Sequence, residues 1–274
     1  MAALVGWAGA AFVSSAPVVW QQDGWRLLAG AAVFAAATLY VLSHLAGWRA
    51  SIRFLAAAFA ISWLAEAIGL HVPWLFGGTY RYHPGVRPLL PGGVPLFIPM
   101  SWYVLAGIAV ILLRGFAIRR ADGRRDWRRI ALKSACLAWG VAACDLALDP
   151  VAVALGLWSW DSPGPYYGVP WLNFAGWGGV AGALGLLGYG WAGLDPGEQC
   201  WTPILFDLAW SASNGMLLLL LAVAADQRLG TGWPLVWCLV ALSPLLVFWH
   251  WGVYRKFRRW GAARPEPARG APQT

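Results

Sequence analysis

Residues 131–156 read ALKSACLAWGVAACDLALDPVAVALG. An apolar run of about 20 residues is long enough to cross the hydrocarbon core of a bilayer as a helix. Apart from Lys133 near its start, this run contains two acidic side chains, Asp145 and Asp149, both well inside it. The stretch therefore predicts a membrane helix that buries two carboxyl groups.

Similar apolar runs recur along the chain, which is 59% hydrophobic and 12% charged. An open sheet leaves backbone groups unsatisfied in lipid, and the alternating pattern of a membrane barrel is absent. We therefore expect an all-α fold, a polytopic integral membrane helix bundle within a single transmembrane domain over residues 1–260. Residues 261–274, rich in Pro, Ala and Arg, are expected to form a disordered cytoplasmic tail. Eight transmembrane helices are expected, at residues 1–20, 25–47, 53–75, 95–117, 131–156, 172–193, 203–225 and 233–254. 

Basic side chains gather in three places, around residues 49–53, 114–133 and 255–269. With eight spans, all three places fall on one side of the membrane. Because cytoplasmic loops carry the excess of Lys and Arg, both termini are predicted to be cytoplasmic, in the cell's inner membrane. This placement accounts for the net charge of +8 without a nucleic-acid partner. Residues 1–20 lack the basic start of a signal peptide and are read as the first span.

Two segments of the chain resemble each other. Gly93-Val94-Pro95 precedes Trp102 as Gly168-Val169-Pro170 precedes Trp177, and upstream lie Tyr80-Arg81-Tyr82 and Trp158-Ser159-Trp160. The pattern predicts a parallel internal repeat of helical hairpins, with halves at about 53–117 and 131–193. Sites in such proteins tend to lie between the repeats.

Each half carries a carboxyl group deep in an apolar run. Glu66 lies thirteen residues after Arg53, roughly 20 Å along a helix, and Asp145 lies twelve after Lys133. Both are therefore expected near mid-membrane, where an ionisable group is costly unless it is neutralised or paired. A catalytic role is favoured over a structural hydrogen bond between helices.

Asp149 lies one helical turn after Asp145, so the two carboxyl groups share a face and one of them should hold a proton. Pro150 frees a carbonyl one turn earlier, which leaves open the alternative that Asp149 caps a kinked helix end.

Several further side chains are candidates for contact with a substrate or water. The histidines show no metal-ligand spacing and no nucleotide signature is present, so no metal and no cofactor is expected. The substrate-binding candidates are Trp63, Tyr80, Tyr82, Trp102, Trp139, Tyr167, Asn173, Trp177 and Asp207.

Buried carboxylic acids among aromatic rings suit acid–base chemistry on an apolar substrate. A carboxyl group that keeps its proton can protonate an alkene, tryptophan faces stabilise the resulting cation, and a carboxylate activates water. The product would be a tertiary alcohol.

Over about residues 60–180 the chain resembles the carotenoid biosynthesis protein family that includes CruF-type carotenoid 1,2-hydratases. The resemblance implies a hydro-lyase that adds water to the terminal 1,2 double bond of an acyclic carotenoid, with a glycosyltransferase as a possible later partner. The matching motifs are Glu66 with Gly69, Phe76-Gly77 before Tyr80-Arg81-Tyr82, Gly93-Val94-Pro95 through Trp102, Asp145 with Asp149-Pro150, and Tyr167-Gly168-Val169-Pro170 through Asn173 and Trp177.

Within this reading, either Glu66 or Asp145 donates the proton, and the other, with Asp149, activates water. Two alternatives remain at this point. A carotenoid end-group cyclase or isomerase would use the same protonation and end it by proton loss. A non-catalytic membrane transporter or lipid-binding protein would use the carboxyl groups only as a relay or scaffold.

Overall fold

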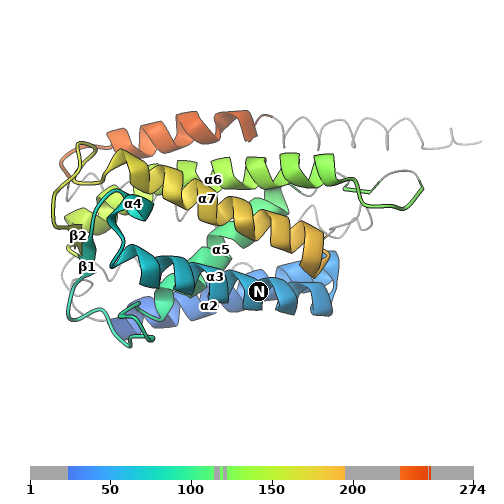
Figure 1. The fold of residues 1–274 in the computed structure, drawn as a ribbon, viewed down its shortest axis with the longest axis horizontal. Helices are drawn as coiled ribbons and strands as arrows, with labels where there is room; N and C mark the ends of the chain where they lie inside the picture. The colour runs from blue at the N-terminus through green and yellow to red at the C-terminus, as the bar shows by residue number, and fades with distance from the viewer. Residues whose placement is uncertain (1–23, 114–117, 120–121, 195–228, 246, 248–274) are drawn as a thin grey trace, which may run out of the picture.

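The computed structural model describes residues 24–113, 118–119, 122–194, 229–245 and 247. The expected spans at 1–20 and 203–225, and with them Asp207, lie outside these residues. Most of the described chain is helical (Figure 1). Its elements in chain order are α2 (Gly24–Ala46), α3 (Trp48–Gly69), α4 (Pro73–Phe76), β1 (Tyr80–Tyr82), α5 (Phe97–Leu112), α6 (Trp127–Ala154), β2 (Trp158–Trp160), α7 (Trp171–Leu186), the π-helical turn η2 (Leu187–Ala192) and a last helix at Trp233–Leu245.

The described helices are those of a membrane protein in length and composition. The three helices α2, α3 and α6 are long and apolar enough to cross a bilayer, and α5 and Trp233–Leu245 are shorter apolar helices. The helical fold is thus confirmed, while the count of eight spans and the repeat of whole hairpins stay predictions.

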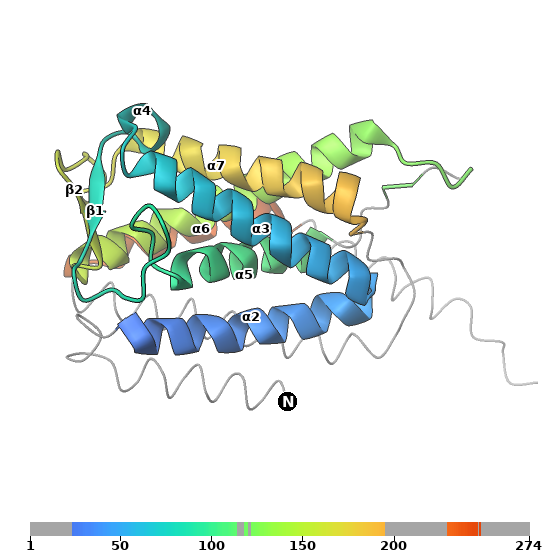
Figure 2. The ribbon, with the colours of Figure 1, turned by 60° about the horizontal axis from the view of Figure 1, so that its bottom comes forward.

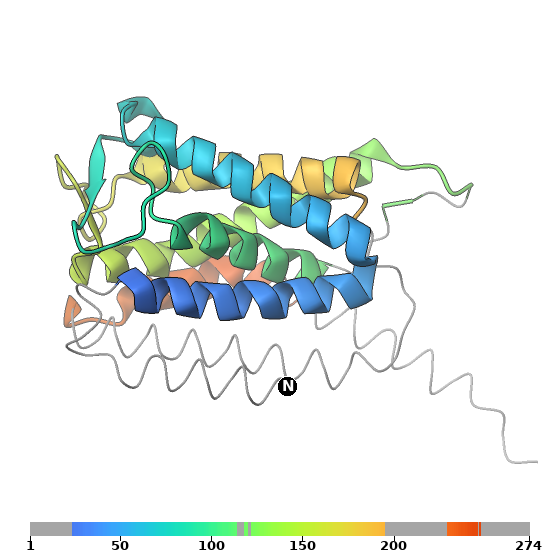
Figure 3. The same cartoon turned by 90° about the horizontal axis from the view of Figure 1, so that it is seen from below.

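The long helices run side by side along the longest axis of the molecule (Figures 1 and 2). Viewed from below, α2 lies beside α5, with α3 and α7 on the other side of α5 (Figure 3). The contact of α6 with α7 uses small residues: a Cβ on Gly182 would lie 3.7 Å from Ala138, and one on Gly185 only 2.8 Å from Ser134. Small residues let two helix backbones approach closely, as is common between membrane helices.

Helix α3 begins and ends about five residues earlier than the span expected at 53–75. Pro73 explains the earlier end, because its ring disfavours helical geometry in the preceding residue, and Val72 is extended at φ −118° and ψ 100°. Glu66 therefore lies in the last turn of α3. The expectation of a carboxyl group at mid-membrane is wrong for Glu66, which lies at one end of the bundle.

Helix α6 also differs from its expected bounds. The Asp126 side chain caps it by accepting from the backbone N–H groups of Arg128 and Arg129, so it starts four residues before 131. It continues through Pro150 to Ala154, and Asp149 is therefore not a helix cap. The Leu146 carbonyl, which Pro150 cannot pair with, accepts a hydrogen bond from the Tyr166 hydroxyl at 3.0 Å.

A two-stranded antiparallel ribbon covers the end of the bundle where Glu66 lies (Figure 2). The ribbon, unexpected in an all-α reading, pairs Tyr80 with Trp160 and Tyr82 with Trp158. The first aromatic residue of each segment thus pairs with the second aromatic residue of the other segment. A local two-fold axis between the two strands gives this pairing. The two similar segments thus meet, and we call this end of the molecule the strand end.

Several exposed tryptophans lie at the two ends of the bundle, and others, such as Trp139, lie along the helices. At the strand end Trp25, Trp74 and Trp171 are exposed, and at the opposite end Trp48 and Trp127. Tryptophan is enriched at both interfaces of a bilayer with water. The 22 residues of α3, which separate the two levels, span about 33 Å. This distribution is typical of a protein that lies in a membrane.

Candidate active site

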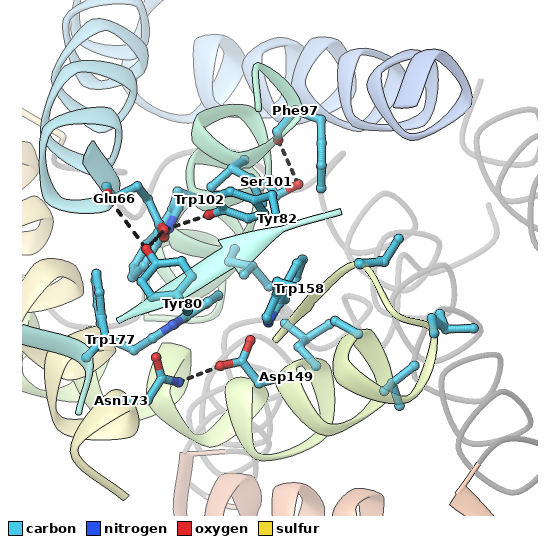
Figure 4. Close-up of a pocket in the computed structure, with 18 of the residues that line it drawn as sticks. Glu66, Tyr80, Tyr82, Phe97, Ser101, Trp102, Asp149, Trp158, Asn173 and Trp177 are labelled. Carbon is cyan, nitrogen blue, oxygen red and sulfur yellow. Dashed lines mark hydrogen bonds between the residues drawn. The ribbon is translucent and has the colours of Figure 1, made fainter. Parts of the chain in front are cut away.

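A cavity of about 190 Å³ lies at the strand end, between helices α3, α5, α6 and α7 and the ribbon (Figure 4). We call it the carboxyl cavity. Its walls are mostly aromatic and aliphatic, with polar groups at a few points. The lining residues are Glu66, Phe76, Tyr80, Tyr82, Phe97, Ile98, Ser101, Trp102, Leu105, Leu148, Asp149, Val151, Ala152, Leu155, Leu157, Trp158, Trp160, Asn173 and Trp177.

The Glu66 carboxyl group is held by three hydrogen-bond donors. The hydroxyls of Tyr80 and Tyr82 donate to Oε2 at 2.5 and 2.7 Å, and Trp102 Nε1 donates to Oε1 at 2.9 Å. An ionised carboxylate accepts on both oxygens and donates on neither, which is the pattern of these three hydrogen bonds. Glu66 is therefore held as an acceptor, in a fixed orientation, although it is buried.

The ribbon positions two of these donors. Successive residues of a strand point to opposite faces, so Tyr80 and Tyr82 both face the cavity while Arg81 points away and pairs with Asp161. Burial raises the pKa of both phenols, and the negative charge of Glu66 raises it further. Both tyrosines thus remain protonated and able to donate.

A second carboxyl set lies across the cavity from Glu66 (Figure 4). The side-chain amide of Asn173, in the first turn of α7, donates to Asp145 Oδ2 at 2.8 Å and to Asp149 Oδ2 at 2.5 Å. Two carboxylates so close repel each other when both are ionised, and a shared proton relieves the repulsion. Asn173 therefore holds a carboxyl pair that can carry one proton.

The two members of this pair are not equivalent. Asp149 lines the carboxyl cavity, whereas Asp145 lies behind it and is fully buried. Within the described part of the chain, Asp145 Oδ1 is a buried oxygen without a hydrogen-bond partner. Asp149 is thus the carboxyl group that meets a molecule in the cavity, and Asp145 supports it.

Aromatic faces line the space between the two carboxyl sets. Trp102 and Trp177, the equivalent tryptophans of the two similar segments, stack with ring centroids 4.2 Å apart and planes inclined by 27°. Trp158 and Trp160 of β2 belong to the same lining. Such faces attract a positive charge.

The structure brings together most of the side chains expected at the site from sequence. Glu66 and Asp149 lie in the lining with Tyr80, Tyr82, Trp102, Asn173 and Trp177. It also adds Ser101, which no pattern in the sequence had indicated. Trp158 and Trp160 were missed as well, although they stand in the quoted aromatic segment that resembles Tyr80-Arg81-Tyr82.

Three of the expected substrate-binding residues lie outside the lining of the carboxyl cavity. Trp139 is 55% exposed and its indole donates to the Ala241 carbonyl at 2.7 Å. Trp63 donates instead to the Pro91 carbonyl at 2.8 Å. Tyr167 packs edge-on against the ring of Tyr166. The helix face on which a tryptophan lies is set by packing, and a position within a span does not reveal it.

Asn173→Leu is expected to destabilise the protein, because it leaves two buried carboxyl groups without their shared donor. Each unsatisfied buried group costs about 1–3 kcal/mol, so thermal unfolding in detergent should begin several degrees lower. Ser162→Leu, at an exposed position of the loop after β2, is the control. An unfolding temperature equal to that of wild type would show that the amide bridge does not hold the pair.

Within the described ranges, no three His, Cys, Asp or Glu side chains gather into a group that suits a metal ion.

Comparison with known proteins identifies the family of the chain. Residues 25–241, most of its length, match the family described as carotenoid biosynthesis protein. The chain belongs to this family.

One relative is the bisanhydrobacterioruberin hydratase of Haloarcula japonica, which is 36% identical to this family member over 135 residues. The match covers 47% of the present chain and 42% of the relative. It thus spans less than half of the relative's length. No solved structure matches the chain.

Proposed function

We propose that this protein is a carotenoid hydratase that adds water to the terminal 1,2 double bond of an acyclic carotenoid end group. The observation that carries the proposal is the pair of carboxyl sets on facing sides of one aromatic cavity, one hydrogen-bonded as an acceptor and the other able to hold a proton. Membership of the carotenoid biosynthesis family and the likeness to a hydratase support it.

The size of the carboxyl cavity fits an end group. Sites that enclose a drug-sized ligand measure about 300–1,000 Å³, more than the 190 Å³ found here. A long polyene would place only its terminal isoprenoid unit between the carboxyl sets. The rest of the substrate lies outside this cavity.

In the first step the Asp149 carboxyl group protonates C2 of the terminal double bond. The π electrons form the new C–H bond, C1 becomes a tertiary cation, and the Asp145–Asp149 pair is left without its proton. The stacked Trp102 and Trp177 and the negative charge of Glu66 stabilise the cation.

In the second step water attacks C1 and its proton passes to Glu66. The oxygen lone pair forms the C–O bond, and one O–H bond of the water breaks toward the carboxylate, which leaves a neutral tertiary alcohol. Before the next turnover one proton leaves Glu66 and one returns to the aspartate pair, so the net reaction consumes only water. This scheme revises the roles expected from sequence, where either Glu66 or Asp145 was the donor and the other, with Asp149, activated water. Here Asp149 is the donor, Glu66 activates water, and Asp145 is a positioning residue.

We place the protein in the cytoplasmic membrane with the strand end directed away from the cytoplasm. The basic side chains Arg124, Arg125 and Arg128 lie at the start of α6, at the opposite end of the bundle. The positive-inside bias assigns that end to the cytoplasm. Both termini would then be cytoplasmic, and a glycosyltransferase that modifies the new hydroxyl remains a candidate partner.

Trp177→Leu is expected to slow hydration, because it removes one aromatic face beside the cation. A cation–π contact contributes about 0.5–2 kcal/mol, which corresponds to about a 2- to 30-fold lower rate. Trp177→Phe retains a ring and should recover most of the loss. Initial rates with detergent-solubilised protein measure both, and equal losses in the two variants would argue against a role for the ring.

The proposed function is tested by expressing the protein in a host that accumulates an acyclic carotenoid. Products that have gained the mass of one water, identified by mass spectrometry, are the expected result. Products of unchanged mass but altered absorption would instead identify a cyclase or isomerase. Unconverted carotenoid, with the protein present in the membrane, would favour a non-catalytic role.

A further inference from the structure

A second cavity, of about 280 Å³, lies at the strand end on the loop side of β1. We call it the loop cavity. It is formed by the end of α3, by β1 and by the loop between β1 and α5. Besides Tyr80 and Tyr82, the polar side chains in its wall are His71, Arg81, His83 and Arg87.

Two residues belong to the walls of both cavities. Tyr80 and Tyr82 line the loop cavity and the carboxyl cavity alike. Their hydroxyls reach Oε2 of Glu66 at 2.5 and 2.7 Å. The two linings therefore share only these two phenol side chains. Both phenols donate to Glu66, the carboxylate to which we assign water activation.

The loop cavity suits water. A buried water occupies about 30 Å³ and needs two to four polar partners, so 280 Å³ holds several molecules. His71, Arg81 and Arg87 are exposed, so their polar groups meet solvent at the protein's edge. On the inner side the wall contains Tyr80 and Tyr82, whose hydroxyls donate to Glu66.

The carboxyl cavity by itself offers water a poor route. Aromatic and aliphatic side chains make up most of its lining, and an apolar end group would fill it during reaction. Each turnover nevertheless consumes one water at the cation. Water that arrives from the loop cavity would reach Glu66 without crossing the space that the polyene occupies.

We propose that the loop cavity is a water port, through which the water consumed in hydration reaches Glu66 past Tyr80 and Tyr82. This inference rests on the proposed hydratase function. The ligand is water, delivered from the side of the membrane that the strand end faces. The apolar substrate and the water thereby enter the site through separate openings.

The port is tested by filling it with side chains that touch neither carboxyl set. Leu89→Trp and His71→Trp each place an indole at an exposed position of the loop-cavity wall. Each variant is expected to form at least fivefold less hydrated carotenoid than wild type. Because the cation still forms and then loses a proton, the ratio of same-mass isomers to hydrated product should rise.

Ser162→Trp is the matched control, since Ser162 is exposed at the strand end outside both linings. It should retain wild-type yield and product ratio. The amount of folded protein in the membrane, measured by size exclusion in detergent, normalises every yield.

An unchanged product ratio in both Leu89→Trp and His71→Trp would overturn the water port while wild type still hydrates. A wild-type protein that forms no hydrated product would instead refute the proposed function. The two failures are therefore distinguishable in one set of measurements.

Discussion

Glu66→Gln is expected to lower the rate of carotenoid hydration by about 10²- to 10⁴-fold, the usual contribution of a positioned acid or base. The glutamine amide keeps the size of the side chain but carries no negative charge and takes no proton from water. In the wild-type protein Tyr80, Tyr82 and Trp102 donate hydrogen bonds to the two carboxylate oxygens. The N–H₂ group of glutamine would replace one of these acceptors with a donor. Stopped assays on solubilised protein measure the rate.

Two variants serve as controls for Glu66→Gln. Tyr82→Phe removes one donor and leaves the carboxylate, so its loss should be much smaller. Asp122→Asn makes the same carboxyl-to-amide change in an exposed loop, where Asp122 accepts from the backbone N–H of Arg124, and it should have no effect. A Glu66→Gln protein that is folded and as active as wild type would rule out Glu66 as the water-activating group.

Asp149→Asn is expected to cause a loss of similar size, about 10²- to 10⁴-fold, because it removes the proton that starts the reaction. An asparagine amide does not protonate an alkene. Unlike Glu66→Gln, this variant should form neither hydrated product nor same-mass isomers, since no cation arises. Mass spectrometry of the recovered carotenoid distinguishes the two variants.

Asp145→Asn tests whether Asp145 only positions Asp149 or itself donates the proton. Because Asp145 lies behind Asp149 and outside the cavity lining, its variant should retain more activity than Asp149→Asn. Groups that act as one unit are not additive, so the double variant should be no slower than Asp149→Asn alone. If the Asp145→Asn protein were slower than the Asp149→Asn protein, Asp145 would be the proton donor and Asp149 the positioning residue.

The carboxyl groups were accessible to sequence reasoning because a charge inside an apolar run is costly and therefore informative. Glu66, Asp145 and Asp149 stand out in this way. The aromatic candidates were harder to judge. Trp102 and Trp177 lie in the site while Trp63 and Trp139 do not, although all four lie in apolar runs. Composition shows that an indole is present, but only packing determines which cavity it faces.

The sequence by itself determined the helical membrane class, the similarity between the two aromatic segments and the carboxyl residues, because hydropathy and charge act residue by residue. Only the tertiary structure decided how these parts meet. It moved Glu66 from mid-membrane to the last turn of α3, where Pro73 ends the run, and paired the aromatic segments as β1 and β2. It also set Asp149 rather than Asp145 against the cavity. These outcomes depend on contacts between residues far apart in the chain, such as Asn173 with Asp149 and Trp102 with Glu66, which no local pattern specifies.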